Sequence, residues 1–369
     1  MSCTSLKRIY VSDLWSIESV TDQGENMFYG DTGLVGAVAY DDTNYGITMA
    51  NYQTGYLTHI NDKPEELLII DAIDYQETTK IYLDDYGNEI VVPAGFKARP
   101  DLATLAEDGI VIEDEIGNQF VWVPIGNVAL SNGTTTIDLG RYSFNNSTGE
   151  ATLVDNAQTV VDTETYTDIS SYSGAAVTET ATNSDYPTSD EALLEWLESA
   201  ISNKGYYISR FEIGTMNGDY VSMEGIDNAI GDSVVAKNGA SAVIEGNDYV
   251  ESRLVNSFAW DTALHFIQQC SGNTTYSALI PSDFGSLITG DSGDVECNIY
   301  DMALNASEWT TEHSTDVNVV RGGAFGVGWD SYPLWAGIRM AYPGLDTSVN
   351  TPNLVLPGIG FRATLLVDR

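Results

Sequence analysis

Short runs in which apolar and polar residues alternate dominate the chain, and Gly, Asn and Asp residues that favour turns separate them. Residues 34–40 form one such run. Residues 79–83 and 90–92 form two more, and between them Gly87 and Asn88 can adopt the positive φ that a tight hairpin requires. The pattern predicts short strands connected by turns rather than a bundle of helices.

The order of these runs predicts two parts of unequal size. Residues 1–75 are predicted to form a small β-rich N-terminal module, and residues 76–369 a larger domain. A stretch near residues 145–185 is rich in Asn, Ser, Thr and Asp and holds few apolar residues. We therefore expect a polar insertion within the larger domain.

Two segments have the apolar spacing of an amphipathic helix. The first follows Thr188 and Glu191, which form a capping-box pattern. Its apolar positions share one helical face: Leu193, Leu197, Ala200 and Ile201. The second segment covers residues 260–267, and Gly272 follows where a helix can end. The chain is thus predicted to be α+β, with short strands, many turns and two helices.

Charge excludes one class of partner. The chain has 54 acidic and 15 basic residues and a formal net charge of −39, so a nucleic-acid backbone would be repelled over most of its surface. No apolar run is long enough to cross a bilayer, and the start of the chain lacks the apolar stretch of a signal peptide. We expect no nucleic-acid binding and no membrane insertion, and no signal peptide is visible.

Six segments occur in an order that resembles the formylglycine-generating, or sulfatase-modifying, family. The most specific are residues 308–310 (Glu-Trp-Thr), 321–323 (Arg-Gly-Gly) and 360–362 (Gly-Phe-Arg). The others are residues 120–124, 205–212 and 252–254 with Trp260 and Asp261, and the Glu-Trp-Thr segment begins at Asn298. The resemblance covers residues 76–369 and implies a loop-rich C-type-lectin-like fold with small antiparallel sheets and two helices.

The catalytic chemistry of that family is not apparent in this chain. Its enzymes hold a copper ion with two cysteines between Arg-Gly-Gly and Gly-Phe-Arg, and residues 321–369 here contain no cysteine. Cys270 and Cys297 lie elsewhere and are best interpreted as small buried apolar residues. The three histidines are scattered without ligand spacing. We expect neither copper nor catalysis.

The segment between Arg-Gly-Gly and Gly-Phe-Arg combines Pro and Gly residues, which predict exposed loop, with aromatic residues and Arg, which dominate recognition surfaces. From Arg321 to Arg369 the net charge is +1, whereas the rest of the chain carries −40. We predict a ligand-binding surface centred on residues 326–353. Its candidate residues are Trp329, Asp330, Tyr332, Trp335, Arg339, Tyr342, Asn350 and Asn353.

The resemblance also implies a structural calcium site. Its side-chain ligands correspond to Asp301 and Glu308, and its carbonyl ligands to Leu304 and Ala306. Hard oxygen ligands of this kind suit calcium. The family has Gly where this chain has Leu304, and the alternative is that the two carboxylates cap or bridge neighbouring loops. A second acidic set for a cation is Asp291, Asp294 and Glu296.

These observations predict a non-catalytic ligand-binding protein of the adhesin or phage receptor-binding type. It would act outside a cell, on a cell surface or on a phage virion, and would bind an external protein or glycan. The N-terminal module would serve homo-oligomerisation or virion assembly. The chain resembles the variable proteins of diversity-generating retroelements, although Trp329, Trp335 and Met340 do not fit free diversification. Two alternatives remain open: a formylglycine-generating-type oxidase with an unrecognised site, and a structural virion or surface component.

Overall fold

The computed structural model describes residues 9–11, 15–17, 26–34, 36–38, 40–59, 67–68, 74–165, 191–279, 287–314, 317–323, 335–343 and 359–368. The chain divides into two compact units, Met1–Glu66 and Leu67–Arg369. Strands and turns predominate, and the described residues contain four α-helices. The predicted α+β class with small antiparallel sheets is confirmed. None of the helices in these ranges is long and apolar enough to span a bilayer.

Turns rather than strands make up the smaller unit. Strands β1 (Tyr10–Val11) and β2 (Thr58–His59) pair in parallel, and a 3₁₀ turn covers Ile47–Met49. The predicted strand over residues 34–40 is wrong, because the described part of this run bends. A Cβ on Gly36 would lie 2.3 Å from the backbone of Tyr56. The chain at Gly36 and the chain at Tyr56 therefore cross closely instead of pairing as strands. The description of the module as β-rich is therefore wrong for its described residues.

The larger unit begins earlier than the predicted boundary at residue 75. Strand β3 (Leu67–Leu68) pairs in parallel with β4 (Lys80–Leu83), and β4 pairs with β5 (Glu89–Val92) to complete a three-stranded sheet. The β4–β5 hairpin is the one predicted from the sequence. Gly87 in its turn has a φ of 83°, as the turn chemistry requires.

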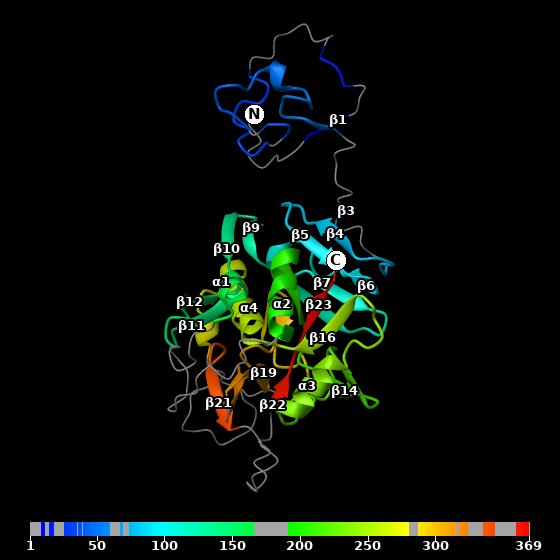
Figure 1. The fold of residues 1–369 in the computed structure, drawn as a ribbon, viewed down its shortest axis with the longest axis vertical. Helices are drawn as coiled ribbons and strands as arrows, with labels where there is room; N and C mark the ends of the chain where they lie inside the picture. Colours follow the sequence, from blue (N-terminus) through cyan, green and yellow to red (C-terminus); the bar gives the residue numbers. More distant parts are fainter. Residues whose placement is uncertain are drawn as a thin grey trace. The chain divides into compact units, whose positions relative to one another are not determined.

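A six-stranded sheet forms the centre of the larger unit (Figure 1). All five neighbouring pairs in it are antiparallel. Its strands, in spatial order, are β16 (Val250–Leu254), β23 (Ala363–Val367), β13 (Gly205–Ser209), β8 (Gln119–Pro124), β7 (Val111–Asp114) and β6 (Phe96–Ala98). The last strand of the chain thus lies inside the sheet, between β16 and β13.

Both faces of this sheet are buried, and the alternation of side chains divides the interior into two cores. In β8, Phe120 and Trp122 join one core, whereas Val121 and Val123 join the other. Because successive strand residues point to opposite faces, an uninterrupted apolar strand can serve both cores. This explains why the β8 sequence is apolar without alternating.

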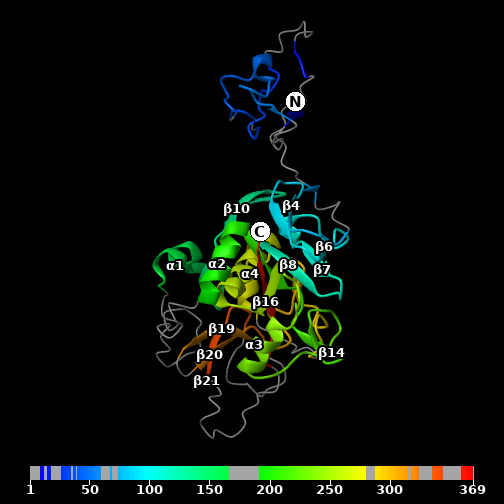
Figure 2. The ribbon, with the colours of Figure 1, turned by 45° about the vertical axis from the view of Figure 1, so that its right-hand side comes forward.

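Helices α2 (Glu191–Asn203) and α4 (Ser257–Cys270) pack on one of these cores. Figures 1 and 2 both show them beside the central sheet, whereas α3 (Ser233–Ser241) lies toward β22. Helices α2 and α4 confirm the two predicted helices. The expectation of only two helices is wrong, because α1 (Ala157–Thr163) and α3 also form in the described chain. Asn156 and Asp232 cap their N-termini by accepting backbone N–H groups.

A four-stranded sheet lies next to this core and carries the C-terminal sequence motifs. Its spatial order is β21 (Arg339–Pro343), β20 (Val317–Arg321), β19 (Ser307–Ser314) and β22 (Ile359–Phe361). Only the β19–β22 pair in it is parallel. Two-stranded ribbons complete the unit: β9 (Gly126–Leu130) with β10 (Gly133–Ile137), β11 (Gly140–Phe144) with β12 (Ala151–Asn156), β14 (Gly214–Met216) with β15 (Asp219–Val221), and β17 (Val295–Glu296) with β18 (Ile299–Tyr300).

Two hairpin turns share the sequence pattern Asp-x-x-Gly-Asn and the same hydrogen bonds. In one of them, the Asp84 carboxylate accepts the N–H of Tyr86 and Asn88 and the Asn88 side chain. In the other, Asp114 makes the equivalent bonds with residues 116–118. Acidic turns of this kind are therefore structural here, because the carboxylate closes the turn itself.

We predict that Asn118→Ala lowers the free energy of unfolding by about 2–3 kcal/mol. The buried Asn118 side chain donates to Asp114 and to the Val243 carbonyl, and it accepts the Ser222 N–H at 2.9 Å. Urea denaturation measures the change. The exposed Asn127→Ala substitution is the control and should cost less than about 0.5 kcal/mol. Equal effects of the two substitutions would contradict this account.

Candidate ligand-binding site

A buried network of ion pairs lies where strands β20 and β21 meet helix α4. Three arginines face three carboxylates, so the charges balance. The arginines are Arg141, Arg321 and Arg339, and the carboxylates are Asp155, Asp261 and Glu312. Each of the six side chains is at most 8% exposed. A network buried to this degree holds its strands together only while every charge keeps its partner.

Asp261 is the centre of this network. One of its carboxylate oxygens pairs with Arg321, and the other lies 2.7 Å from a terminal nitrogen of Arg339. The Nε of Arg339 donates to Glu312 at 2.9 Å, and Arg141 pairs with both Glu312 and Asp155. The network therefore links α4 to β19, β20, β21 and the β11–β12 ribbon.

The charges in the network are strongly coupled. Burial alone would raise the pKa of Glu312, but Arg141 and Arg339 lower it to about 2. Burial lowers the pKa of Arg321 to about 10 despite the nearby Asp261 carboxylate. Glu312 and Arg321 therefore remain ionised at neutral pH.

The two glycines that follow Arg321 are required by close packing. Gly322 has a φ of 74°, and a Cβ on it would lie 2.9 Å from the Met302 carbonyl oxygen. A Cβ on Gly323 would lie 2.5 Å from the carbonyl oxygen of Ala303. Only glycine fits both positions. The Arg-Gly-Gly element thus has a structural role. Its arginine forms a buried ion pair, and its two glycines let two chain segments cross closely in the core.

Two of the predicted ligand-binding residues are buried, so their assignment to an exposed surface is wrong. Trp335 is 5% exposed and packs in the apolar core, and Arg339 is 2% exposed and paired with Asp261 and Glu312. Tyr342 lies in β21, opposite Asn318 of β20, and its side chain lies outside the described residues. The remaining candidates also lie outside the described residues: Trp329, Asp330, Tyr332, Asn350 and Asn353.

Arg362, in the Gly-Phe-Arg element, forms a second buried pair with Glu308. Its Nε lies 2.8 Å and 3.0 Å from the two carboxylate oxygens, and a terminal nitrogen lies 2.6 Å from one of them. The same guanidinium donates to the carbonyls of Ser209 and Tyr300. Arg362 thereby joins the backbone at Ser209 and at Tyr300 to β19.

Three further carboxyl groups lie in or beside this region. Glu212 is fully buried and accepts the Ala306 N–H and the side-chain amides of Asn228 and Asn305. Asp301 accepts the Gly290 N–H at 2.7 Å. Burial raises the pKa of Asp301 and of Asp294, and it raises that of Glu212 well above the ordinary range, with Asp301 and Glu308 adding to the effect.

The side chains of the two predicted calcium-ligand carboxylates have partners inside the protein. Both oxygens of Glu308 are engaged by Arg362, whose positive charge would repel a cation. Asp301 is likewise engaged by Gly290 and Ser292. Within the described ranges, no three His, Cys, Asp or Glu side chains are grouped to hold a metal ion. The engaged side chains favour the alternative that the two carboxylates bridge neighbouring loops, and the calcium site at these residues stays a prediction.

Two residues of the second acidic set, Asp294 and Glu296, also make hydrogen bonds inside the protein. Asp294 accepts the Tyr276 hydroxyl at 2.9 Å and the N–H groups of Ala303 and Leu304. Glu296 accepts the side-chain amide of Asn273 at 3.0 Å. These contacts favour a loop-bridging role for the two carboxylates over a cation site.

The two described cysteines do not have the properties of reactive thiols. Cys270 and Cys297 both pack against the apolar core. Burial raises the pKa of Cys270 to about 12, and it raises that of Cys297 further. Because the thiolate is the nucleophile and the metal ligand, both residues behave as the small apolar side chains that the sequence predicted.

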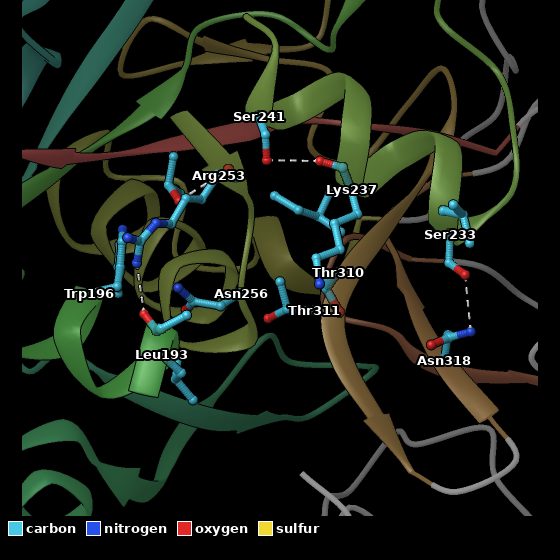
Figure 3. A pocket seen from close by; sticks show the side chains of 14 residues that line it. Leu193, Trp196, Ser233, Lys237, Ser241, Arg253, Asn256, Thr310, Thr311 and Asn318 are labelled. Atoms are coloured by element: carbon cyan, nitrogen blue, oxygen red, sulfur yellow. Dashed lines mark hydrogen bonds between the residues drawn. The ribbon is translucent and has the colours of Figure 1, made fainter. Parts of the chain in front are cut away.

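A pocket of about 510 Å³ opens between helices α2 and α3 (Figure 3). Strands β16, β19, β20 and β23 also contribute to its wall. The lining residues are Ala192, Leu193, Trp196, Ser233, Val234, Lys237, Ser241, Arg253, Leu254, Asn256, Thr310, Thr311, Asn318 and Thr364. Sequence reasoning missed this pocket, because its residues come from segments up to 172 positions apart and share no local motif.

Comparison with known proteins adds no identification. No protein-family model matches the chain, and no curated protein matches it at a significant level. The resemblance of the six sequence segments to the formylglycine-generating family therefore stays a prediction.

We predict that Asp261→Asn lowers the free energy of unfolding by about 3–5 kcal/mol, because two buried arginines lose their shared counter-charge. Urea denaturation monitored by tryptophan fluorescence measures this loss. The control is Asp101→Asn, which removes an ion pair with Arg99 at a carboxylate that is 59% exposed and should cost less than about 1 kcal/mol. A small effect at Asp261 would show that the network does not hold the sheet.

We also predict that the protein loses stability as the pH rises above the ordinary pKa range of Asp and Glu. Glu212, Asp294 and Asp301 have raised folded pKa values, so their contribution is complete below about pH 4 and is lost as the pH passes the folded pKa. Each proton concerned changes the free energy of unfolding by about 1.4 kcal/mol per pH unit.

Urea denaturation between pH 5 and pH 8 tests this prediction. About 0.5 M salt screens repulsion between exposed charges and should leave the slope from the buried groups. Glu212→Gln should make the free energy of unfolding depend less on pH, whereas the exposed Glu198→Gln should leave this dependence unchanged. Stability that increases over this range in wild type would refute the assignment.

Proposed function

We propose that this protein is a non-catalytic ligand-binding protein, of the adhesin or phage receptor-binding type, that recognises an external protein or glycan. Its contact residues would come from residues 324–334 and 344–358, whose sequences include Trp329, Tyr332 and Asn350. Aromatic residues and amides are typical of recognition surfaces.

Both segments connect strands of the sheet formed by β19, β20, β21 and β22, which the buried ion pairs hold together; we call these four strands the ion-paired frame. This frame is the observation that carries the proposal. Residues 324–334 join the end of β20 to the start of β21, where Arg321 and Arg339 face each other across the two strands. Residues 344–358 join β21 to β22, where Gly360 lies opposite Glu308 of β19. Proteins that bind through variable segments place them on a rigid scaffold of this kind.

The same frame supports the finer fold assignment, a C-type-lectin-like domain of the formylglycine-generating family. In it, the motif residues Trp260, Asp261, Arg321 and Arg362 come together around one helix. Trp260 lies between two arginines, with its ring 5.8 Å from the Arg321 guanidinium and 5.7 Å from that of Arg362. The motif elements are thus explained by structural needs that do not depend on catalysis.

A binding function accounts for the described chemistry better than an oxidase. The buried arginines and carboxylates are engaged with one another, and burial keeps the thiols of Cys270 and Cys297 protonated. Copper titration together with a cysteine-containing peptide distinguishes the two: turnover of the peptide would favour the oxidase. The third candidate, a structural virion or surface component, predicts no binding that depends on residues 324–358.

We predict that the double substitution Trp329→Ala and Tyr332→Ala weakens ligand binding about tenfold or more, because aromatic anchors carry much of the binding free energy. The measurement is binding of labelled protein to a glycan array and to intact bacterial cells. The matched control is Tyr249→Ala, which removes a 48% exposed tyrosine elsewhere. Unchanged binding by the double variant, with its thermal unfolding also unchanged, would reject these segments as the contact surface.

A further inference from the structure

The pocket between α2 and α3 differs in charge from the rest of the protein. About one residue in seven of the chain is acidic, yet none of the 14 lining side chains is Asp or Glu. Two of the chain's 15 cationic residues, Lys237 and Arg253, line it. On a surface with a net charge of −39, this is a local site at which an anion is not repelled.

The two cations have different roles. Arg253 pairs with Glu195 and Glu251 and donates to the Ala192 carbonyl at 3.0 Å. Lys237 forms no ion pair with any residue that the structure describes. Figure 3 shows its side chain extending from α3 toward the side of the pocket formed by β19. The uncompensated charge in the pocket is therefore that of Lys237.

Other hydrogen-bonding groups line the same pocket. Ser233 and Asn318 are linked to each other at 3.3 Å, and the Ser241 hydroxyl donates to the Lys237 carbonyl. Thr311 lines the β19 side of the pocket. A pocket that holds a charged nitrogen together with hydroxyl and amide groups suits a carboxylate or a sulfonate.

The opposite wall of the pocket is apolar. Leu193 and Trp196 of α2 and Leu254 of β16 line it. On α3, Val234 also lines the pocket, and 60% of its surface is exposed. An exposed Val beside a Lys with no ion pair provides an apolar contact and an anion contact about one helical turn apart. The volume of the pocket suits a molecule of drug size.

We propose that this pocket is a second binding site, separate from the C-terminal segments, for a small organic anion with an apolar body. The acidic head would bind Lys237 and the neighbouring polar groups. The apolar body would lie against Val234, Leu193 and Leu254. Free inorganic anions would lack the apolar contact, and neutral apolar molecules would lack the charge contact.

A pair of matched dyes tests the proposal on the full chain. 8-Anilinonaphthalene-1-sulfonate is an aromatic anion that fluoresces in apolar surroundings, and N-phenyl-1-naphthylamine is its uncharged counterpart. We expect saturable binding of the anionic dye. Lys237→Gln should raise its Kd about tenfold or more and leave the Kd of the neutral dye within about twofold. Val234→Ser should weaken the binding of both dyes.

The control substitution is Lys80→Gln, which removes an exposed lysine on β4 and should change neither Kd. Circular dichroism checks that each variant is folded. Absence of saturable binding of the anionic dye would overturn the proposal, and so would equal Kd values for wild type and Lys237→Gln. Equal weakening of both dyes by Lys237→Gln would also overturn it, because the lysine would then not act through charge.

Discussion

The arrangement of the larger unit depends on one carboxylate, that of Asp261. It neutralises Arg321 and Arg339 on two neighbouring strands, while the adjacent Trp260 contacts Arg321 and Arg362. Buried arginines without a counter-charge would be strongly destabilising. Helix α4 must therefore lie where it does, and strands β20 and β21 must be in register with it. The apolar cores supply most of the folding free energy, but this carboxylate fixes the position of the four-stranded sheet.

The buried ion pairs also change how the surface charge should be interpreted. Five of the 15 cationic side chains are arginines buried among the described residues: Arg141, Arg210, Arg321, Arg339 and Arg362. Four of them pair with carboxylates inside the protein, whereas Arg210 donates to the side chain of Gln119. Few cations therefore remain to offset the acidic surface. A positive net charge over residues 321–369 therefore does not indicate a positive surface there. Lys237 is exposed and unpaired within the described structure, so it is the better indicator of anion binding.

Local sequence signals predicted local structure well. The α2 and α4 helices and the Gly87 hairpin follow from periodicity and turn chemistry, which act within a few residues. The capping box predicted at Thr188 lies outside the described residues. The burial of Arg339 could not be predicted in this way, because its partner Asp261 lies 78 positions away. Trp335 was assigned to an exposed loop from neighbouring Pro and Gly residues, although long-range packing decides its burial. The pocket was missed for the same reason.

Strand β20 connects the two proposed binding regions physically. Arg321 at one end is held by Asp261, and Asn318 near the other end lines the pocket and contacts Ser233 of α3. Strand β19 is similar, with Thr310 in the pocket wall and Glu312 in the ion network. A wall built on ion-paired strands needs little ordering when a ligand enters, so less binding free energy is lost to conformational entropy. The ion pairs that hold these strands together therefore also preorganise the pocket.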